Sequence, residues 1–162
     1  MSSERTEFGV KRSSCTCSMC RANCRVMPGF LIPSDLDRMI PPEADAFDWA
    51  EKNLLASPGA IAMRDGKVFR IPTLVPAVKP DGSCIHLTEE GLCDIHETAP
   101  FGCAFFDCND PPENLGTYGL QAVMKSVGAY RMLWHYLHSI GKRQKGPEEL
   151  RKKIPYSRKG GR

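Results

Sequence analysis

The chain has 162 residues, of which 41% are hydrophobic and 25% charged, and its formal net charge is +3. This length and composition fit one globular domain with a modest core, and thirteen prolines and fourteen glycines argue against a helical bundle or a large sheet. No apolar run approaches the length of a transmembrane helix, and the N-terminal residues lack the apolar segment of a secretory signal. We therefore expect a cytoplasmic protein that does not enter a membrane.

The charge is unevenly distributed along the chain. Residues 142–162 contain nine Lys or Arg against two Glu, a local charge of +7, which leaves −4 on residues 1–141. This pattern predicts a disordered arm at 1–14, a folded domain at 15–141 and a basic flexible tail at 142–162. Nucleic-acid binding through the tail is the lesser alternative, because Tyr156 is its only aromatic residue.

Four cysteines lie within ten residues near the N-terminus: Cys15, Cys17, Cys20 and Cys24. Such a closely spaced group can wrap one ion in the manner of a zinc knuckle or a ferredoxin loop. The spacing of Cys17, Cys20 and Cys24 is the reverse of that in radical SAM enzymes, which disfavours that class. The basic residues that flank the group either offset thiolate charge or form a solvated segment, and both interpretations stay open.

Two short helices are predicted next. Ser34 stands as an N-cap before Asp-Leu-Asp-Arg-Met-Ile, with Asp37 adding a carboxylate to the same helix end. Residues 43–56 predict the second helix, which ends at a Ser-Pro-Gly stop. Residues 60–71 predict a β-hairpin with its turn at Asp65-Gly66. Residues 73–78 predict an edge strand, because Pro76 cannot donate a hydrogen bond to a sheet.

The second cysteine group consists of Cys84, Cys93, Cys103 and Cys108. Short strands around Cys84 and Cys93 are predicted to form a hairpin with a four-residue loop at 88–91. This register opposes His86 to Cys93, so that Cys84 and Cys93 project from one face. A slip of one residue would separate the two cysteines.

A helix from about Thr117 to Gly141 is the longest predicted element. Its apolar face, which we expect to pack on the small sheet, consists of Leu120, Val123, Met124, Val127, Tyr130, Trp134, Leu137 and Ile140. His135 and His138 lie three residues apart on this helix. Because no carboxylate motif accompanies them, we interpret them as surface or satisfied histidines rather than a metal pair.

All eight cysteines are predicted to be metal ligands. A cytosolic chain favours metal over disulfides, because cytosolic thiols are kept reduced. Four thiolates suit either Zn²⁺ or a 4Fe–4S cluster, since both accept tetrahedral sulfur. We expect the two groups to meet in space, because the segment between them has no second hydrophobic core. Whether they form one site or two stays open.

These residues resemble the YkgJ-type cysteine-cluster family, a zinc- or iron-chelating domain. The residues that carry the resemblance are Cys17, Cys20, Cys24, Asp35-Leu36, Cys84, Leu87, Gly91, Cys93, Ile95, Pro100, Cys103 and Phe105. The resemblance covers about residues 15–108 and implies metal binding through cysteines. Two departures are the three residues between Cys20 and Cys24, where the family has adjacent cysteines, and His96, which stands at a common tyrosine position and opens a ligand role for this histidine.

The sequence thus predicts an α+β fold: a small, loop-rich, metal-stapled domain with short hairpins, two short N-terminal helices and one long C-terminal helix. The predicted function is metal binding, with zinc or a 4Fe–4S cluster held through two groups of four cysteines. The alternatives are an iron–sulfur oxidoreductase or transferase accessory enzyme, and a metal chelator or carrier. No nucleotide-binding loop and no hydrolase motif supports an enzyme.

Overall fold

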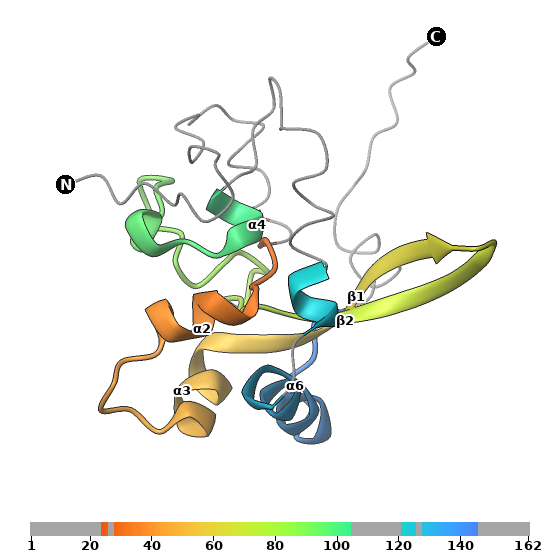
Figure 1. The fold of residues 1–162 in the computed structure, drawn as a ribbon. Coiled ribbons are helices and arrows are strands. Elements are labelled where there is room, and N and C mark those ends of the chain that lie inside the picture. Colours follow the sequence, from red (N-terminus) through yellow and green to blue (C-terminus); the bar gives the residue numbers. More distant parts are fainter. Residues whose placement is uncertain (1–23, 26–27, 105–120, 126–127, 146–162) are drawn as a thin grey trace, which may run out of the picture.

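A computed structural model describes residues 24–25, 28–104, 121–125 and 128–145. In chain order its elements are α2 (Pro33–Met39), α3 (Ala46–Asn53), β1 (Leu54–Arg64), β2 (Lys67–Pro76), the 3₁₀ turn η1 (His96–Thr98), α4 (Phe101–Ala104) and α6 (Ala129–Ser139). The base of the β1–β2 hairpin lies in the middle of the fold, with α3 and α6 on one side and α2 and α4 on the other (Figure 1). The predicted α+β class is confirmed.

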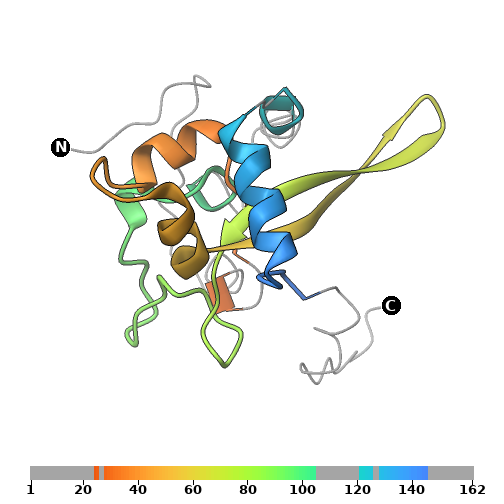
Figure 2. The same cartoon turned by 90° about the horizontal axis from the view of Figure 1, so that it is seen from below.

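The two strands form an antiparallel hairpin whose far end extends away from the helices (Figures 1 and 2). Its turn is at Asp65 and Gly66, as predicted, and both residues have left-handed backbone angles, with φ of 52° and 72°. The predicted edge strand at 73–78 is instead the last part of β2, which ends at Pro76. A bulge in β1 includes Gly59, where a Cβ atom would overlap the carbonyl of Ile71.

The two short helices differ from prediction at their ends. Helix α2 begins at Pro33, and the Asp35 carboxylate accepts the Ile32 backbone N–H at 2.8 Å, so neither Ser34 nor Asp37 caps the helix as predicted. Proline suits this first position because its missing N–H has no partner there in any case. Helix α3 has Asp45 as its N-cap and ends at Asn53, three residues earlier than predicted.

The prediction of one continuous helix from 117 to 141 is wrong. Residues 121–124 are helical, and α6 begins only at Ala129, directly after Gly128. Gly128 has a φ of 79°, a left-handed conformation that glycine adopts at little cost and that cannot continue a right-handed helix. The apolar spacing continues across this break, which is why periodicity alone did not detect it. Residues 117–120 and 126–127 lie outside the described residues.

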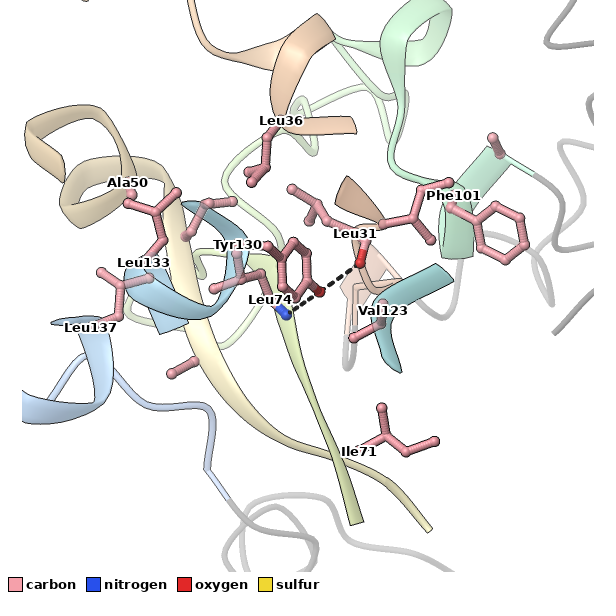
Figure 3. Packing of buried hydrophobic residues seen from close by; sticks show 14 residues of the cluster. Leu31, Leu36, Ala50, Ile71, Leu74, Phe101, Val123, Tyr130, Leu133 and Leu137 are labelled. Carbon is pink, nitrogen blue, oxygen red and sulfur yellow. Dashed lines mark hydrogen bonds between the residues drawn. The ribbon is translucent and has the colours of Figure 1, made fainter. Parts of the chain in front are cut away.

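The hydrophobic core lies where α6 and α3 pack against the base of the hairpin (Figures 2 and 3). Leu31, Leu74 and Leu137 are fully buried there. The Tyr130 hydroxyl, on α6, donates to the carbonyl of Leu31 at 2.7 Å and accepts the N–H of Leu74 at 2.8 Å (Figure 3). This pair of bonds fixes the segment before α2, which follows the first cysteine group, against β2.

The chain after α6 returns to the hairpin. Ala56 of β1 donates its N–H to the Lys142 carbonyl and accepts the N–H of Gln144, both at 2.8 Å. The start of the predicted basic tail, residues 142–162, is therefore part of the fold, a correction to the boundary at 141. Residues 146–162 and the predicted arm at 1–14 lie outside the described residues. In the described part of the chain, no helix has the length and apolar character needed to span a bilayer.

Candidate metal centre

Four of the eight predicted ligands lie in the described part of the chain: Cys24, Cys84, Cys93 and Cys103. The other four, Cys15, Cys17, Cys20 and Cys108, lie outside it. Cys84 is buried, and the other three described cysteines are partly buried. The described set includes one member of the first group and three of the second, so it tests whether the groups meet.

The two cysteine groups do meet at Cys24. Its carbonyl accepts the backbone N–H of Cys84 at 2.7 Å, although sixty residues separate the two in sequence. Cys103 is also joined to the chain near Cys24, because its Sγ accepts the N–H of Gly29, five residues after Cys24, at 3.2 Å. The prediction of proximity is confirmed for this member of the first group.

The backbone of Gly102, directly before Cys103, crosses the backbone of Gly29, which lies in the segment that follows Cys24. We call this contact the glycine crossing. Gly102 donates its N–H to the carbonyl of Phe30 at 2.9 Å, and a Cβ on Gly102 would lie 2.6 Å from the Phe30 nitrogen. A Cβ on Gly29 would overlap the backbone of Gly102. The two chains can approach this closely only because both positions are glycine.

The side chain of Asp35 strengthens the same crossing. One of its oxygens accepts the N–H of Ile32 at 2.8 Å and that of Phe101 at 2.9 Å. Its other oxygen accepts from Arg38 at 2.7 Å, and the carboxylate is fully buried. Segments 29–32 and 101–103 are therefore held together by backbone contact and by a buried charged side chain.

The hairpin that carries Cys93 has a register one residue away from the predicted one. Leu87 pairs with Cys93, and the Asp94 N–H donates to the His86 carbonyl at 2.9 Å. The loop has three residues because Thr88 pairs with Leu92, and it ends at a left-handed Gly91 with a φ of 78°. The predicted four-residue loop is therefore wrong, because Thr88 belongs to the paired arm of the hairpin and not to the loop.

As a result of this register, His86 lies opposite Asp94 rather than Cys93. Cys84 does not pair within this hairpin but forms a bridge with Val78. The arrangement of Cys84 and Cys93 as diagonal neighbours on one hairpin face is therefore also wrong. The chain folds back on itself between Val78 and Asp94 through two separate bridges, Val78 with Cys84 and Leu87 with Cys93.

A backbone N–H group points at one of the sulfur atoms, because the Gly29 N–H donates to Cys103 Sγ at 3.2 Å. The backbone of His86 acts to lower the pKa of Cys84. Such donors favour the thiolate form, which is the form that binds metal.

Burial has the opposite and larger effect on the thiols of the metal-free protein. It raises the pKa of Cys84 to about 11, and it raises the pKa of Cys24 and of Cys103 above the ordinary value. These thiols are therefore protonated near neutral pH when no cation is bound. A metal that binds them displaces the protons, which couples metal affinity to pH.

The described side chains do not yet form a closed ligand cage. Within residues 24–25, 28–104, 121–125 and 128–145, no three His, Cys, Asp or Glu side chains are positioned to hold one ion. Half of the predicted ligands lie outside these residues.

The remaining histidine predictions concern α6 and η1. His135 and His138 are exposed, and both contact Trp134, whose ring stacks on His138 with a centroid distance of 4.9 Å. They are surface residues, as predicted. His96, at the start of η1, is also exposed.

A separate cavity of about 310 Å³ lies against α6 and β2, lined by Arg70, Ile71, Val123, Tyr130, Arg131 and Trp134 among others. None of the four described cysteines lines it. The thiol cluster is the candidate site, because the predicted chemistry and the observed convergence of distant segments coincide there.

Comparisons of the chain with protein-family models, curated proteins and solved structures found no match. The resemblance to the YkgJ-type family therefore stays a prediction based on the cysteine pattern.

Proposed function

We propose that the chain is a cytoplasmic metal-binding protein that holds zinc or an iron–sulfur cluster through its two cysteine groups. The observation that carries the proposal is the contact between the two cysteine groups: the Cys24 carbonyl accepts the Cys84 N–H, and Cys103 Sγ accepts the N–H of Gly29, which follows closely after Cys24 in the sequence. Four thiols gathered in reducing cytosol have no disulfide chemistry to perform, and metal ligation is the usual reason for such a group.

The local structure supports this proposal on energetic grounds. Between Ala77 and Pro100, the described chain has only isolated bridges, turns and one 3₁₀ turn. A loop-rich segment of this kind buries little apolar surface, so cross-linking by a metal would supply folding free energy that packing does not.

Zinc and a 4Fe–4S cluster remain the two candidates, since both accept four thiolates. The test is to purify the full chain without oxygen, count zinc and iron by elemental analysis and record the visible spectrum. Zinc predicts a colourless protein with stoichiometric zinc, and a cluster predicts a brown protein with iron and sulfide. Alkylation of the denatured protein should modify eight thiols in either case.

The test variant is Cys93→Ser, which removes one described thiol at a partly buried position. We expect it to lose metal relative to the wild type. A wild-type protein with neither zinc nor iron, or with mostly bridged cysteines, would contradict the proposed function. A brown protein whose colour changes on reduction would favour the oxidoreductase alternative.

A further inference from the structure

The cavity against α6 and β2 is built from three parts of the fold. Its volume is about 310 Å³, at the small end of the range of roughly 300–1,000 Å³ that is typical of small-molecule sites. Among its walls, Ile71 comes from β2, Tyr130 from α6 and Val123 from the helical segment 121–124 (Figure 3). All three residues belong to the hydrophobic core. The core therefore holds these walls of the cavity in place.

Two aromatic rings on α6, those of Tyr130 and Trp134, line the cavity in fixed positions. The Tyr130 hydroxyl is held by its two bonds to backbone groups. The Trp134 Nε1–H donates to the carbonyl of Ser57 at 2.8 Å, and the indole ring stacks on His138. Because both rings are ordered before a ligand arrives, a flat molecule that packs on them has little side-chain entropy to overcome.

The described residues that line the cavity carry positive charge without a matching negative one. They include Arg70, Arg131 and His135, and no Asp or Glu. A guanidinium group stays charged throughout the pH range of folded proteins. In the part of the chain that the structure describes, no carboxylate pairs with either arginine. Arg131 donates from Nη2 to the carbonyl of Met124 at 3.1 Å, which leaves further donors of the same side chain for a ligand. The cavity therefore favours an anion.

We propose that this cavity binds a small aromatic carboxylate. Its ring packs against Tyr130 and Trp134, and its carboxylate accepts hydrogen bonds from Arg70 and Arg131. Arginine suits a carboxylate because its planar side chain can donate two parallel hydrogen bonds to the two oxygens. Since none of the four described cysteines lines the cavity, this site is separate from the candidate metal centre. The inference goes beyond the proposed function and does not depend on it.

An anion with an apolar ring fits this cavity better than a bare inorganic anion. Both Arg70 and Arg131 are exposed, and a contact between exposed charges contributes little free energy in water. Burial of apolar ligand surface against the ring and aliphatic side chains must therefore supply much of the affinity. Inorganic phosphate has no such surface to bury, so it should bind weakly.

The test titrates 2-naphthoate into the full chain and follows the two tryptophan side-chain N–H signals by nuclear magnetic resonance. Trp134 lines the cavity, whereas Trp49 lies on α3 and does not line it. We expect a saturable shift of the Trp134 signal and little change at Trp49. The neutral amide, 2-naphthamide, keeps the rings and removes the charge, so it should bind about 10-fold more weakly. Inorganic phosphate should bind more weakly than 2-naphthoate as well.

Two variants test the arginines. Arg70→Gln and Arg131→Gln each remove one charged donor, and each should weaken 2-naphthoate binding about 10-fold. The matched control is Lys67→Gln, which removes the same charge from the same strand at a position that does not line the cavity, and it should bind as the wild type does. If Arg131→Gln does not fold, Arg70→Gln decides the question.

Three results would overturn the inference, whether or not the protein holds a metal. The first is the absence of a saturable shift at Trp134. The second is equal binding of 2-naphthoate and its neutral amide, or of 2-naphthoate and inorganic phosphate. The third is an equal loss of affinity in Arg70→Gln and Lys67→Gln.

Discussion

Tyr130 and Asp35 each join backbone segments that lie far apart in the sequence. Tyr130 connects α6 with Leu31 and Leu74, and Asp35 connects Ile32 with Phe101. Both side chains are buried, so the backbone groups that they bond have no access to water. Polar side chains of this kind specify which segments meet, because leaving any of these groups without a partner is costly.

Substitution of Tyr130 tests this role at the residue scale. Tyr130→Phe keeps the ring and removes the hydroxyl, which leaves the Leu74 N–H without an acceptor and the Leu31 carbonyl without a donor. We expect a loss of about 1–3 kcal/mol in the free energy of unfolding, measured by urea denaturation at pH 7. The matched control is Tyr136→Phe, whose hydroxyl donates to Glu51 in a less buried position and should cost less.

The contribution of the Tyr130 hydroxyl to the free energy of unfolding should depend on pH. Burial, and to a smaller extent the charge of Asp35, raises the pKa of Tyr130 above its ordinary value. The folded protein therefore keeps the phenolic proton at a pH where the unfolded chain releases it. The contribution of this tyrosine is complete below about pH 10 and declines as the pH rises above that value. The stability difference between wild type and Tyr130→Phe should shrink on going from pH 7 to about pH 11, and an unchanged difference would contradict this account.

At the scale of elements, the features that depend on local backbone chemistry could be predicted from the sequence. The turn at Asp65-Gly66 was predictable, because that residue pair is suited to the left-handed angles of a two-residue hairpin turn. The break at Gly128 was not, since the apolar spacing continues on both sides of it. The hairpin around Cys93 was predicted with a loop one residue too long, and this hid the pairing of His86 with Asp94. A three-residue loop ending in Gly91 would have revealed it.

The glycine crossing near Cys103 had no sequence signal. Gly29 and Gly102 are single glycines in segments that are separated by 73 positions, and only the fold shows that they touch. The convergence of the cysteine groups was predicted from the absence of a second core between them. The contacts that produce it, through these glycines and Asp35, depend on tertiary structure.

Substitution at the crossing tests its importance for the site. Gly102→Ala places a Cβ atom 2.6 Å from the backbone nitrogen of Phe30, and backbone on both sides must move apart. We expect the variant to lose about 1–3 kcal/mol of stability, as in overpacked cores, and to bind Zn²⁺ more weakly than the wild type. Zinc competition and thermal unfolding measure the two effects.

The control for this substitution is Gly82→Asn. Gly82 has a φ of 90° but nothing within 4 Å of the position of a Cβ, and asparagine tolerates positive φ better than most residues. The control variant should retain more stability and more zinc affinity than Gly102→Ala. Equal effects in the two variants would show that the crossing has no special role.

At the scale of the whole molecule, the hydrophobic core and the arrangement of the cysteine segments depend on each other. The core is built by α3, α6 and the hairpin base, and it fixes the segment around Leu31. That segment lies between Cys24 and α2, and it contacts the chain around Cys103. The thiol cluster thus lies at one edge of a core that positions its backbone, while metal would close the loops that the core does not reach.

The proposed function requires that a metal bridges the two cysteine groups. It is tested most directly by hydrogen exchange of the purified full chain, with its metal and after removal by a chelator under reducing conditions. The relevant amides are those of Gly102 and Cys84, which donate to Phe30 and to Cys24 across the two segments. We predict that metal removal accelerates exchange at both amides together, while the Leu74 amide in the core stays protected. Loss of metal with unchanged exchange at Gly102 and Cys84 would contradict the claim.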